Sequence, residues 1–125
     1  MPAVISSWRW PARGKVVGEF SELNKGINIR GHLGEPIYAA ASGKVVYCGN
    51  GLRAYGLLII IQHNDKYMSA YANNGALLVK NGDRVHQGQK IATMGEARNK
   101  HAKLHFEIRA FGHPVNPLEY LPKKG

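Results

Sequence analysis

Apolar residues in this chain occur in short runs separated by turn residues, a pattern typical of β-strands. Residues 15–20, 36–40 and 43–48 are three such runs, and a small turn over residues 41–43 separates the last two. Residues 57–62 are almost continuously apolar, which predicts a strand buried on both faces. Fifteen glycines and six prolines supply turns, and helix signals are weak. The pattern therefore predicts an all-β, mainly antiparallel fold.

The second half of the chain continues this pattern and contains the clearest alternation. Residues 64–66 predict a hairpin turn into a strand over residues 67–71, and residues 102–109 form the last clear strand. Only a short turn near residues 116–120 has helical character. In the last strand, alternation predicts two faces. The core face carries Leu104, Phe106 and Ile108, and the other face carries Lys103, His105, Glu107 and Arg109.

Size and composition indicate one domain with a single core. The chain has 125 residues and is 44% hydrophobic, and no low-complexity linker divides it. We expect an N-terminal extension over residues 1–7, a domain over residues 8–122 and a basic tail over residues 123–125. No run of about 18 apolar residues occurs, so no transmembrane segment is predicted. A lone cysteine, Cys48, is predicted to be a small buried residue and not a nucleophile.

The charge favours anionic partners. Seventeen Lys and Arg residues against eight Asp and Glu residues give a net charge of +9. These charges are scattered and no nucleic-acid recognition motif is present, so nucleic acid is not an expected partner. The glycine-rich residues 49–56 predict a flexible loop beside a cleft. Four further histidines stand next to probable turn residues and are expected at the surface or in capping positions: His32, His63, His86 and His113.

Three segments carry a resemblance to a known family. They are Asn24-Lys25-Gly26-Ile27-Asn28, Tyr71-Ala72-Asn73 and Lys103-Leu104-His105-Phe106-Glu107. They resemble the active-site segments His-x-x-x-Asp, Tyr-Ala-His and His-x-His of the M23 (LytM-type, lysostaphin-like) zinc endopeptidases, which cleave peptide cross-bridges in bacterial cell walls. The resemblance implies that the zinc-binding His and Asp positions are occupied by Asn24 and Asn28. Only one zinc ligand, His105, remains.

Zinc is therefore not expected as a cofactor, and no catalytic residue is assigned. Catalytic zinc sites use at least three protein ligands, and neutral Asn amides are poor ones. The family's two other active-site histidines fall on Asn73 and Lys103, and the Lys103 ammonium would repel a cation. His101 stands four residues from His105, about 13 Å along a strand at about 3.3 Å per residue. That separation is too long for a shared zinc ion unless a bulge shortens it.

Within the family, the chain is most similar to the degenerate LytM domains of NlpD- and EnvC-type amidase activators. The similarity runs from about Trp8 to Pro122 and includes the stretches 49–53, 59–65, 90–95, 104–109 and 115–122. It implies a LytM/M23 β-sheet fold with barrel-sandwich-hybrid-like hairpins and an open groove. Such domains do not cut the wall. They activate periplasmic N-acetylmuramoyl-L-alanine amidases, which hydrolyse peptidoglycan during cell division and daughter-cell separation. A periplasmic or outer-membrane-attached location is implied by the resemblance alone.

The resemblance also predicts which residues would line a partner-binding groove. Neutral amides supply donors and acceptors, cationic side chains pair with acidic groups, and tyrosine rings provide flat anchors. The predicted residues are Asn24, Asn28, Asn73, Lys103, His105, Arg53, Tyr55, Tyr71 and Arg109. The chain departs from the NlpD type at two positions. NlpD-like domains often keep the Asp and the histidine of the Tyr-Ala-His segment, and this chain has Asn28 and Asn73 there.

Three other functions remain open at this point. A peptidoglycan-binding module without enzyme activation would use the same basic surface and groove. An active zinc endopeptidase would need an unorthodox ligand set near His105. A biotinyl or lipoyl carrier is suggested by the hairpin-like residues 82–92, but no modifiable lysine stands at a hairpin tip.

Overall fold

The computed structural model describes residue 5 and residues 7–96 and 101–123. Residues 1–4 and 6 of the predicted extension and residues 124–125 of the predicted tail lie outside this part. Every strand pairing found within it is antiparallel, and its helical segments are two short 3-10 turns. The all-β prediction is therefore confirmed. No helix in the described part is long and apolar enough to cross a membrane.

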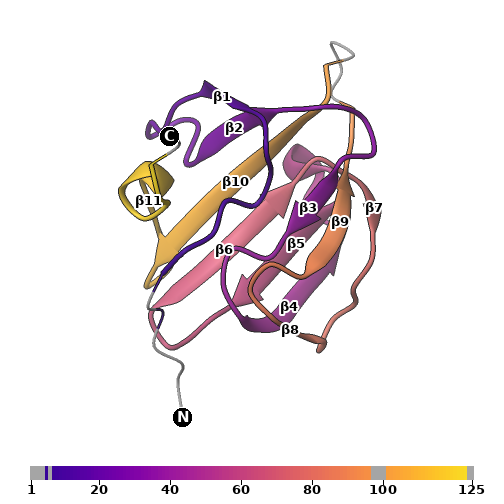
Figure 1. Ribbon diagram of the computed structural model, residues 1–125. Coiled ribbons are helices and arrows are strands. Elements are labelled where there is room, and N and C mark those ends of the chain that lie inside the picture. Colours follow the sequence, from indigo (N-terminus) through magenta and orange to yellow (C-terminus); the bar gives the residue numbers. More distant parts are fainter. Residues whose placement is uncertain (1–4, 6, 97–100, 124–125) are drawn as a thin grey trace.

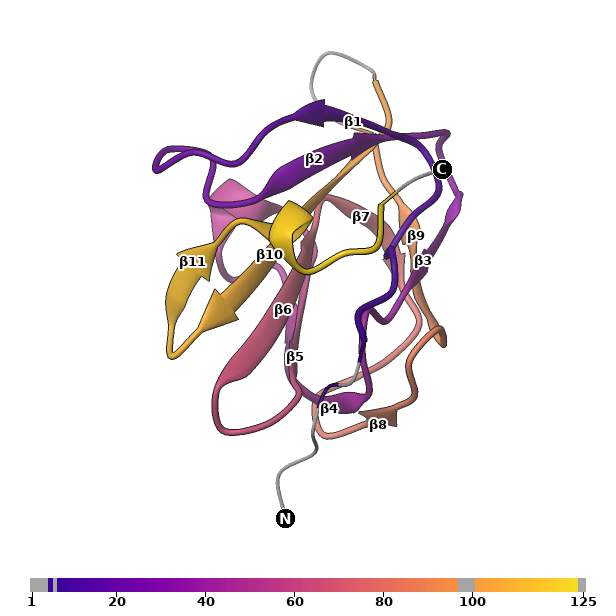
Figure 2. The same ribbon diagram turned by 60° about the vertical axis from the view of Figure 1, so that its left-hand side comes forward.

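Two sheets form two layers (Figures 1 and 2). The large sheet has the order β1 (Lys15–Gly18), β2 (Ile27–Arg30), β10 (Lys103–Ala110), β6 (Tyr67–Ala72), β5 (Leu58–Gln62), β4 (Gly43–Gly49) and β8 (Arg84–Val85), with β11 (His113–Val115) paired to β10. The small sheet has the order β3 (Pro36–Tyr38), β9 (Lys90–Met94) and β7 (Asn74–Leu77). The turns are η1 (Arg53–Tyr55) and η2 (Pro117–Glu119). The small sheet covers one face of the large sheet.

The core lies between these two layers. Inward-facing residues of the large sheet and of the small sheet belong to one buried cluster, which includes Ile27, Ile29, Phe106, Ile37, Ile91 and Met94. Burying an aliphatic or aromatic side chain of this size contributes about 1.5–3 kcal/mol. Strand β10 alternates as predicted, because Leu104, Phe106 and Ile108 have no exposed surface. The opposite face of the large sheet carries the polar residues of β10 beside a smaller apolar cluster that includes Leu58 and Ile60, and this is where a site can form.

Strands β2, β7 and β11 were not predicted from the sequence. Each has only three or four residues. Strand β2 contains the polar Asn28 between two isoleucines, and it is stabilised by pairing with both β1 and β10. Such short strands depend on their neighbours in the sheet, which an isolated segment of sequence does not reveal.

His63 is buried, so the prediction that it lies at the surface or in a capping position is wrong. Only 5% of its surface is exposed, and the Trp8 ring packs edge-on against it with centroids 5.2 Å apart. Its Nδ1 lies 2.8 Å from the Ser42 carbonyl oxygen, and its Nε2 lies 2.7 Å from Ser69 Oγ. A carbonyl can only accept, so the hydrogen of the neutral ring is on Nδ1 and Nε2 accepts from Ser69.

The same hydrogen-bond chain continues to Tyr71. Ser69 Oγ lies 2.7 Å from Tyr71 Oη, which accepts a 2.9 Å hydrogen bond from the Ala40 backbone N–H. Tyr71 is fully buried, and burial raises the pKa of its hydroxyl to about 12. The chain therefore runs in one direction, from Ala40 through Tyr71 and Ser69 to His63, and links the two layers through buried polar groups that are all paired.

We expect removal of the Tyr71 hydroxyl to destabilise the fold. Tyr71→Phe leaves the Ala40 N–H without its acceptor in a dry environment, at a cost of about 1–3 kcal/mol. Urea unfolding measures this cost. Tyr47→Phe is the matched control, because its hydroxyl accepts from Gly51 N–H at the exposed surface, where water can replace it. Equal losses for the two variants would contradict a special contribution from the buried chain.

His63 also predicts a pH dependence of stability. Burial lowers the pKa of His63, and the hydrogen bond to Ser42 only partly opposes this. As the pH falls through about 6.5, the unfolded chain takes up the proton first, so the free energy of unfolding decreases. The contribution is complete above about pH 6.5 and is lost toward lower pH. Urea unfolding at pH 7.5 and 5.5 checks this. His63→Gln should flatten the slope, and the exposed-site control His86→Gln should keep it.

Candidate functional site

A groove of about 710 Å³ lies on the face of the large sheet that points away from the small sheet. Its walls come from the segment before β2, from β2 itself, from η1, from the end of β6 and from β10. The lining includes most of the residues predicted from the sequence, namely Asn24, Asn28, Arg53, Tyr55, Asn73, Lys103 and His105. Residues 103, 105 and 107 point into it because β10 presents its other side chains to the core.

Tyr71 does not line the groove, and its prediction as an anchor for a partner is wrong. In the register of β6 and β10, Tyr71 stands opposite Phe106, so both side chains lie on the core face. The Tyr71 ring packs against Phe106 with centroids 5.3 Å apart and has no exposed surface. The residue on the groove face at the end of β6 is Ala72, opposite His105.

Arg109 also lies outside the groove. It lines an adjoining, mostly apolar hollow of about 280 Å³ together with Leu52, Leu58, Ile60 and Met68. Its Nε and Nη2 lie 2.9 and 2.7 Å from Glu107 Oε1. Arg109 was predicted to line the groove and does not; its guanidinium pairs with a buried carboxylate of its own strand, and its pairing with an acidic group of a partner stays a prediction.

The three positions that the resemblance aligns with the family's zinc ligands are adjacent and connected by hydrogen bonds. Asn24 Nδ2 lies 2.9 Å from Asn28 Oδ1, and Asn28 Nδ2 lies 3.3 Å from His105 Nδ1. Asn24 Nδ2 also donates to the Glu19 and Gly26 carbonyl oxygens, at 2.9 and 2.8 Å. The amides therefore bind each other and the backbone where a zinc site would need an imidazole nitrogen and a carboxylate.

The hydrogen bonds continue from His105 into the buried carboxylate of Glu107. His105 Nε2 lies 2.7 Å from Glu107 Oε2, and only 1% of the Glu107 side chain is exposed. Burial alone would raise the pKa of Glu107, but hydrogen bonds from His105 and Arg109 and the Arg109 charge outweigh it and lower the pKa. The ionised carboxylate accepts from Nε2–H, so Nδ1 accepts from the Asn28 amide. Both ring nitrogens of His105 are thus engaged.

This donor set does not fit a zinc ion. Two of the three positions carry neutral amides, and the nitrogens of the third already bind Asn28 and Glu107. His101, considered above as a substitute ligand, lines a neighbouring hollow with Arg30 and His32 and not the groove itself. Within the described residues, no group of three or more His, Cys, Asp or Glu side chains is arranged to hold a metal ion.

The remaining groove residues include three cationic side chains and one exposed carboxylate, that of Glu96. Asn73 has a left-handed backbone (φ 66°), and its Nδ2 donates to the Lys103 carbonyl oxygen at 2.8 Å. Its backbone N–H donates to the Tyr55 carbonyl oxygen at 2.9 Å, which attaches the glycine-rich loop to the end of β6. Tyr55 lies near His105, with ring centroids 5.9 Å apart. Cationic side chains stand around these groups: Lys25, Arg53 and Lys103.

Comparisons with known proteins identify the family of the chain. The model of peptidase family M23 matches residues 22–117. The chain is 55% identical over 123 residues to the murein hydrolase activator NlpD of Escherichia coli, covering 96% of this chain and 32% of that protein. It is 54% identical over 123 residues to the lipoprotein NlpD/LppB homolog of Pseudomonas aeruginosa, covering 96% of this chain and 41% of that protein. The chain thus spans less than half the length of these relatives.

A solved structure supports the fold assignment. A zinc-containing peptidase from Vibrio cholerae superposes with a TM-score of 0.82 at 27% identity, covering 93% of this chain and 41% of that protein. The predicted LytM/M23 β-sheet fold is confirmed by this similarity and by the family match over residues 22–117. Because the family model covers well over half of its length, this chain belongs to peptidase family M23.

Proposed function

We propose that this domain is a catalytically inactive activator of a periplasmic N-acetylmuramoyl-L-alanine amidase, and that it promotes peptidoglycan hydrolysis during daughter-cell separation. The observation that carries the proposal is the amide network. Asn24 and Asn28 stand where the resemblance places zinc ligands; Asn24 hydrogen-bonds to Asn28, and Asn28 hydrogen-bonds to His105. A groove that retains its shape without a metal site is suited to binding a peptide segment and not to cleaving one.

The relatives support the activator role. One with 55% identity is named a murein hydrolase activator, and another with 54% identity is named a lipoprotein. A hydrolase activator acts on an enzyme of the cell wall, which supports a periplasmic or outer-membrane-attached location for this domain. The choice of an amidase as that enzyme rests on the resemblance to NlpD- and EnvC-type domains.

The groove suggests how activation works. Its floor offers amide donors and acceptors, and its rim carries the positive charges of Lys25, Arg53 and Lys103. It therefore fits a segment of the amidase that carries acidic side chains and covers the amidase active site when the enzyme is off. Holding that segment shifts the amidase toward its open state, by no more than the difference in affinity for the open and closed forms.

Release of dye from labelled sacculi tests this function. We expect release when the domain and an amidase are present together, and only the basal amidase rate when the domain is omitted. Release by the domain alone would contradict the proposal in favour of an endopeptidase. Binding to sacculi with no effect on any amidase would favour a wall-binding module instead.

A charge reversal in the groove tests the binding surface. Lys103→Glu is expected to lower amidase stimulation by about tenfold or more, because it replaces an attractive charge with a repulsive one at the partner interface. The dye-release rate at saturating sacculi measures this. Lys44→Glu is the matched control, since Lys44 is an exposed lysine of β4 outside the groove. If both variants stimulated the amidase as the unmodified domain does, the groove would not be the contact surface.

The absence of zinc binding is itself testable. The purified domain is expected to hold no stoichiometric zinc after dialysis against zinc-containing buffer, measured by inductively coupled plasma mass spectrometry. The double substitution Asn24→His with Asn28→Asp should restore binding, since it rebuilds three ligands at adjacent positions. Adding His105→Asn to that variant should remove it again. Stoichiometric zinc in the unmodified domain would contradict this expectation and would favour an active zinc endopeptidase.

A further inference from the structure

The apolar hollow that adjoins the groove, of about 280 Å³, forms where β6 carries small side chains between β5 and β10 (Figure 1). Alternation places Ala70 and Ala72 on the outer face of β6, while Tyr71 between them faces the core. Ala70 is paired with Ile60 on one side and with Glu107 on the other. A small side chain between two longer ones leaves a depression in the sheet. The rest of the lining consists of Leu52, Tyr55, Leu58, Met68, Ser69, Arg109 and Gly112.

The hollow and the groove are parts of one continuous surface. Ala72 lines the groove and Ala70 lines the hollow, and the two alanines stand about 7 Å apart along β6. Tyr55 and Glu107 line both the groove and the hollow. A single peptide segment that follows β6 can therefore contact the groove and the hollow at the same time.

The two parts of this surface differ in chemistry. The groove carries three cationic side chains and one exposed carboxylate around its amides. In the hollow, the charge of Arg109 is balanced by Glu107 at 2.7 Å, and the other described residues of the lining are uncharged. Charge complementarity in the groove and apolar contact in the hollow together select a segment that has acidic side chains in one part and an apolar side chain in another.

The apolar surface of the hollow is accessible to such a side chain. Leu52 is 48% exposed at its rim, and Ile60 and Met68 are half-buried. The unbranched side chain of Met68 can adapt its shape to a guest. The volume lies below the range of about 300–1,000 Å³ that small-molecule sites occupy, so the hollow fits one side chain better than a whole ligand.

We propose that the hollow binds an aliphatic side chain of the same amidase segment whose acidic side chains meet the groove. This inference rests on the proposed function and adds a second requirement to it, because acidic character alone no longer defines the segment. The aliphatic side chain must stand about 13 Å from the acidic group that meets Lys103, since Glu107 at the hollow is four residues further along β10. An apolar anchor that is buried beside polar contacts carries much of the binding energy of an interface.

The test is direct binding of the chain to an amidase by isothermal titration calorimetry, beside the dye-release rate. Ala70→Leu adds its carbons on the outer face of β6, where they fill the hollow, and should weaken binding by about tenfold or more. Ala76→Leu is the matched control, because Ala76 is an exposed residue of β7 that lines neither the hollow nor the groove. Thermal melts check that both variants fold.

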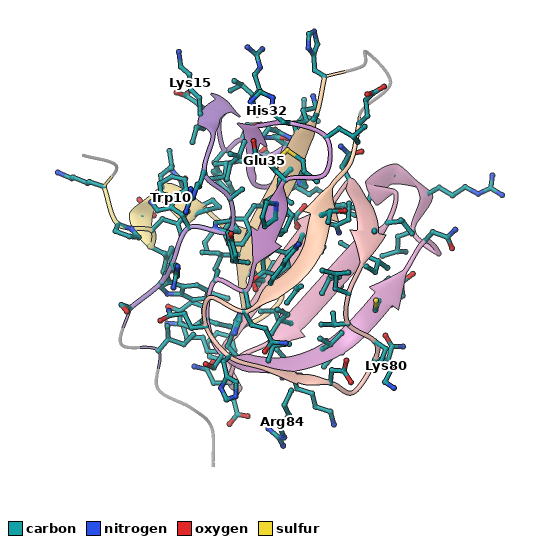
Figure 3. All side chains as sticks on the ribbon, turned by 45° about the vertical axis from the view of Figure 1, so that its right-hand side comes forward. Trp10, Lys15, His32, Glu35, Lys80 and Arg84 are labelled. Carbon is teal, nitrogen blue, oxygen red and sulfur yellow. The ribbon has the colours of Figure 1, made fainter. Side chains whose placement is uncertain are left out.

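A second pair of variants removes apolar surface instead of adding it. Leu52→Ser takes away part of the hollow's rim and should weaken binding by about fivefold or more. Leu78→Ser is its matched control, because Leu78 is 51% exposed and lines neither the hollow nor the groove. Leu78 stands two residues before Lys80, whose side chain points away from the molecule in Figure 3. This control should bind as the unmodified chain does.

The outcomes separate this inference from the proposed function. If Lys103→Glu weakened binding while Ala70→Leu and Leu52→Ser did not, the hollow would not be an anchor site and the activator role would stand. If the hollow variants lost binding but the unmodified chain bound the amidase without raising dye release, the activator role would fail and the anchor site would stand. Self-association of the unmodified chain in sedimentation, lost in Ala70→Leu, would overturn the proposal in favour of a second copy as the occupant.

Discussion

The alternation of β10 is the constraint on which both the core and the groove depend. The strand is paired on both sides, with β2 and with β6, so its register is fixed by two ladders of hydrogen bonds. A slip by one residue would move His105 and Glu107 into the core and expose Leu104 and Phe106. Core packing therefore determines where the polar side chains stand, and the groove retains its geometry whatever chemistry its side chains perform.

This constraint explains what the sequence could and could not predict. The two faces of β10 were predictable because seven consecutive residues alternate without exception, from Lys103 to Arg109. Tyr71 was assigned to the groove because it stands near Asn73 in a family segment, but the side to which it points depends on the register with Phe106, which only the folded sheet reveals. The burial of His63 was not predicted for a similar reason, since Trp8, whose ring packs against His63, is distant from it in sequence.

The one remaining family histidine has a structural role that does not require a metal. Burying the Glu107 carboxylate is costly unless it is paired and hydrogen-bonded. Arg109 supplies the opposite charge, and His105 satisfies the second oxygen at 2.7 Å. On its other side, His105 accepts from Asn28. Its presence beside Asn24 and Asn28 is therefore explained by a continuous hydrogen-bond network from Asn24 to Arg109.

The amide network also replaces the cross-link that a bound ion would provide. Asn24 ties the segment before β2 to the Glu19 and Gly26 carbonyl oxygens and to Asn28, so the groove wall is held without an ion. A wall that is already ordered loses little conformational entropy when a partner binds, which favours affinity. The same amides thus preorganise the groove wall for the partner segment that we propose.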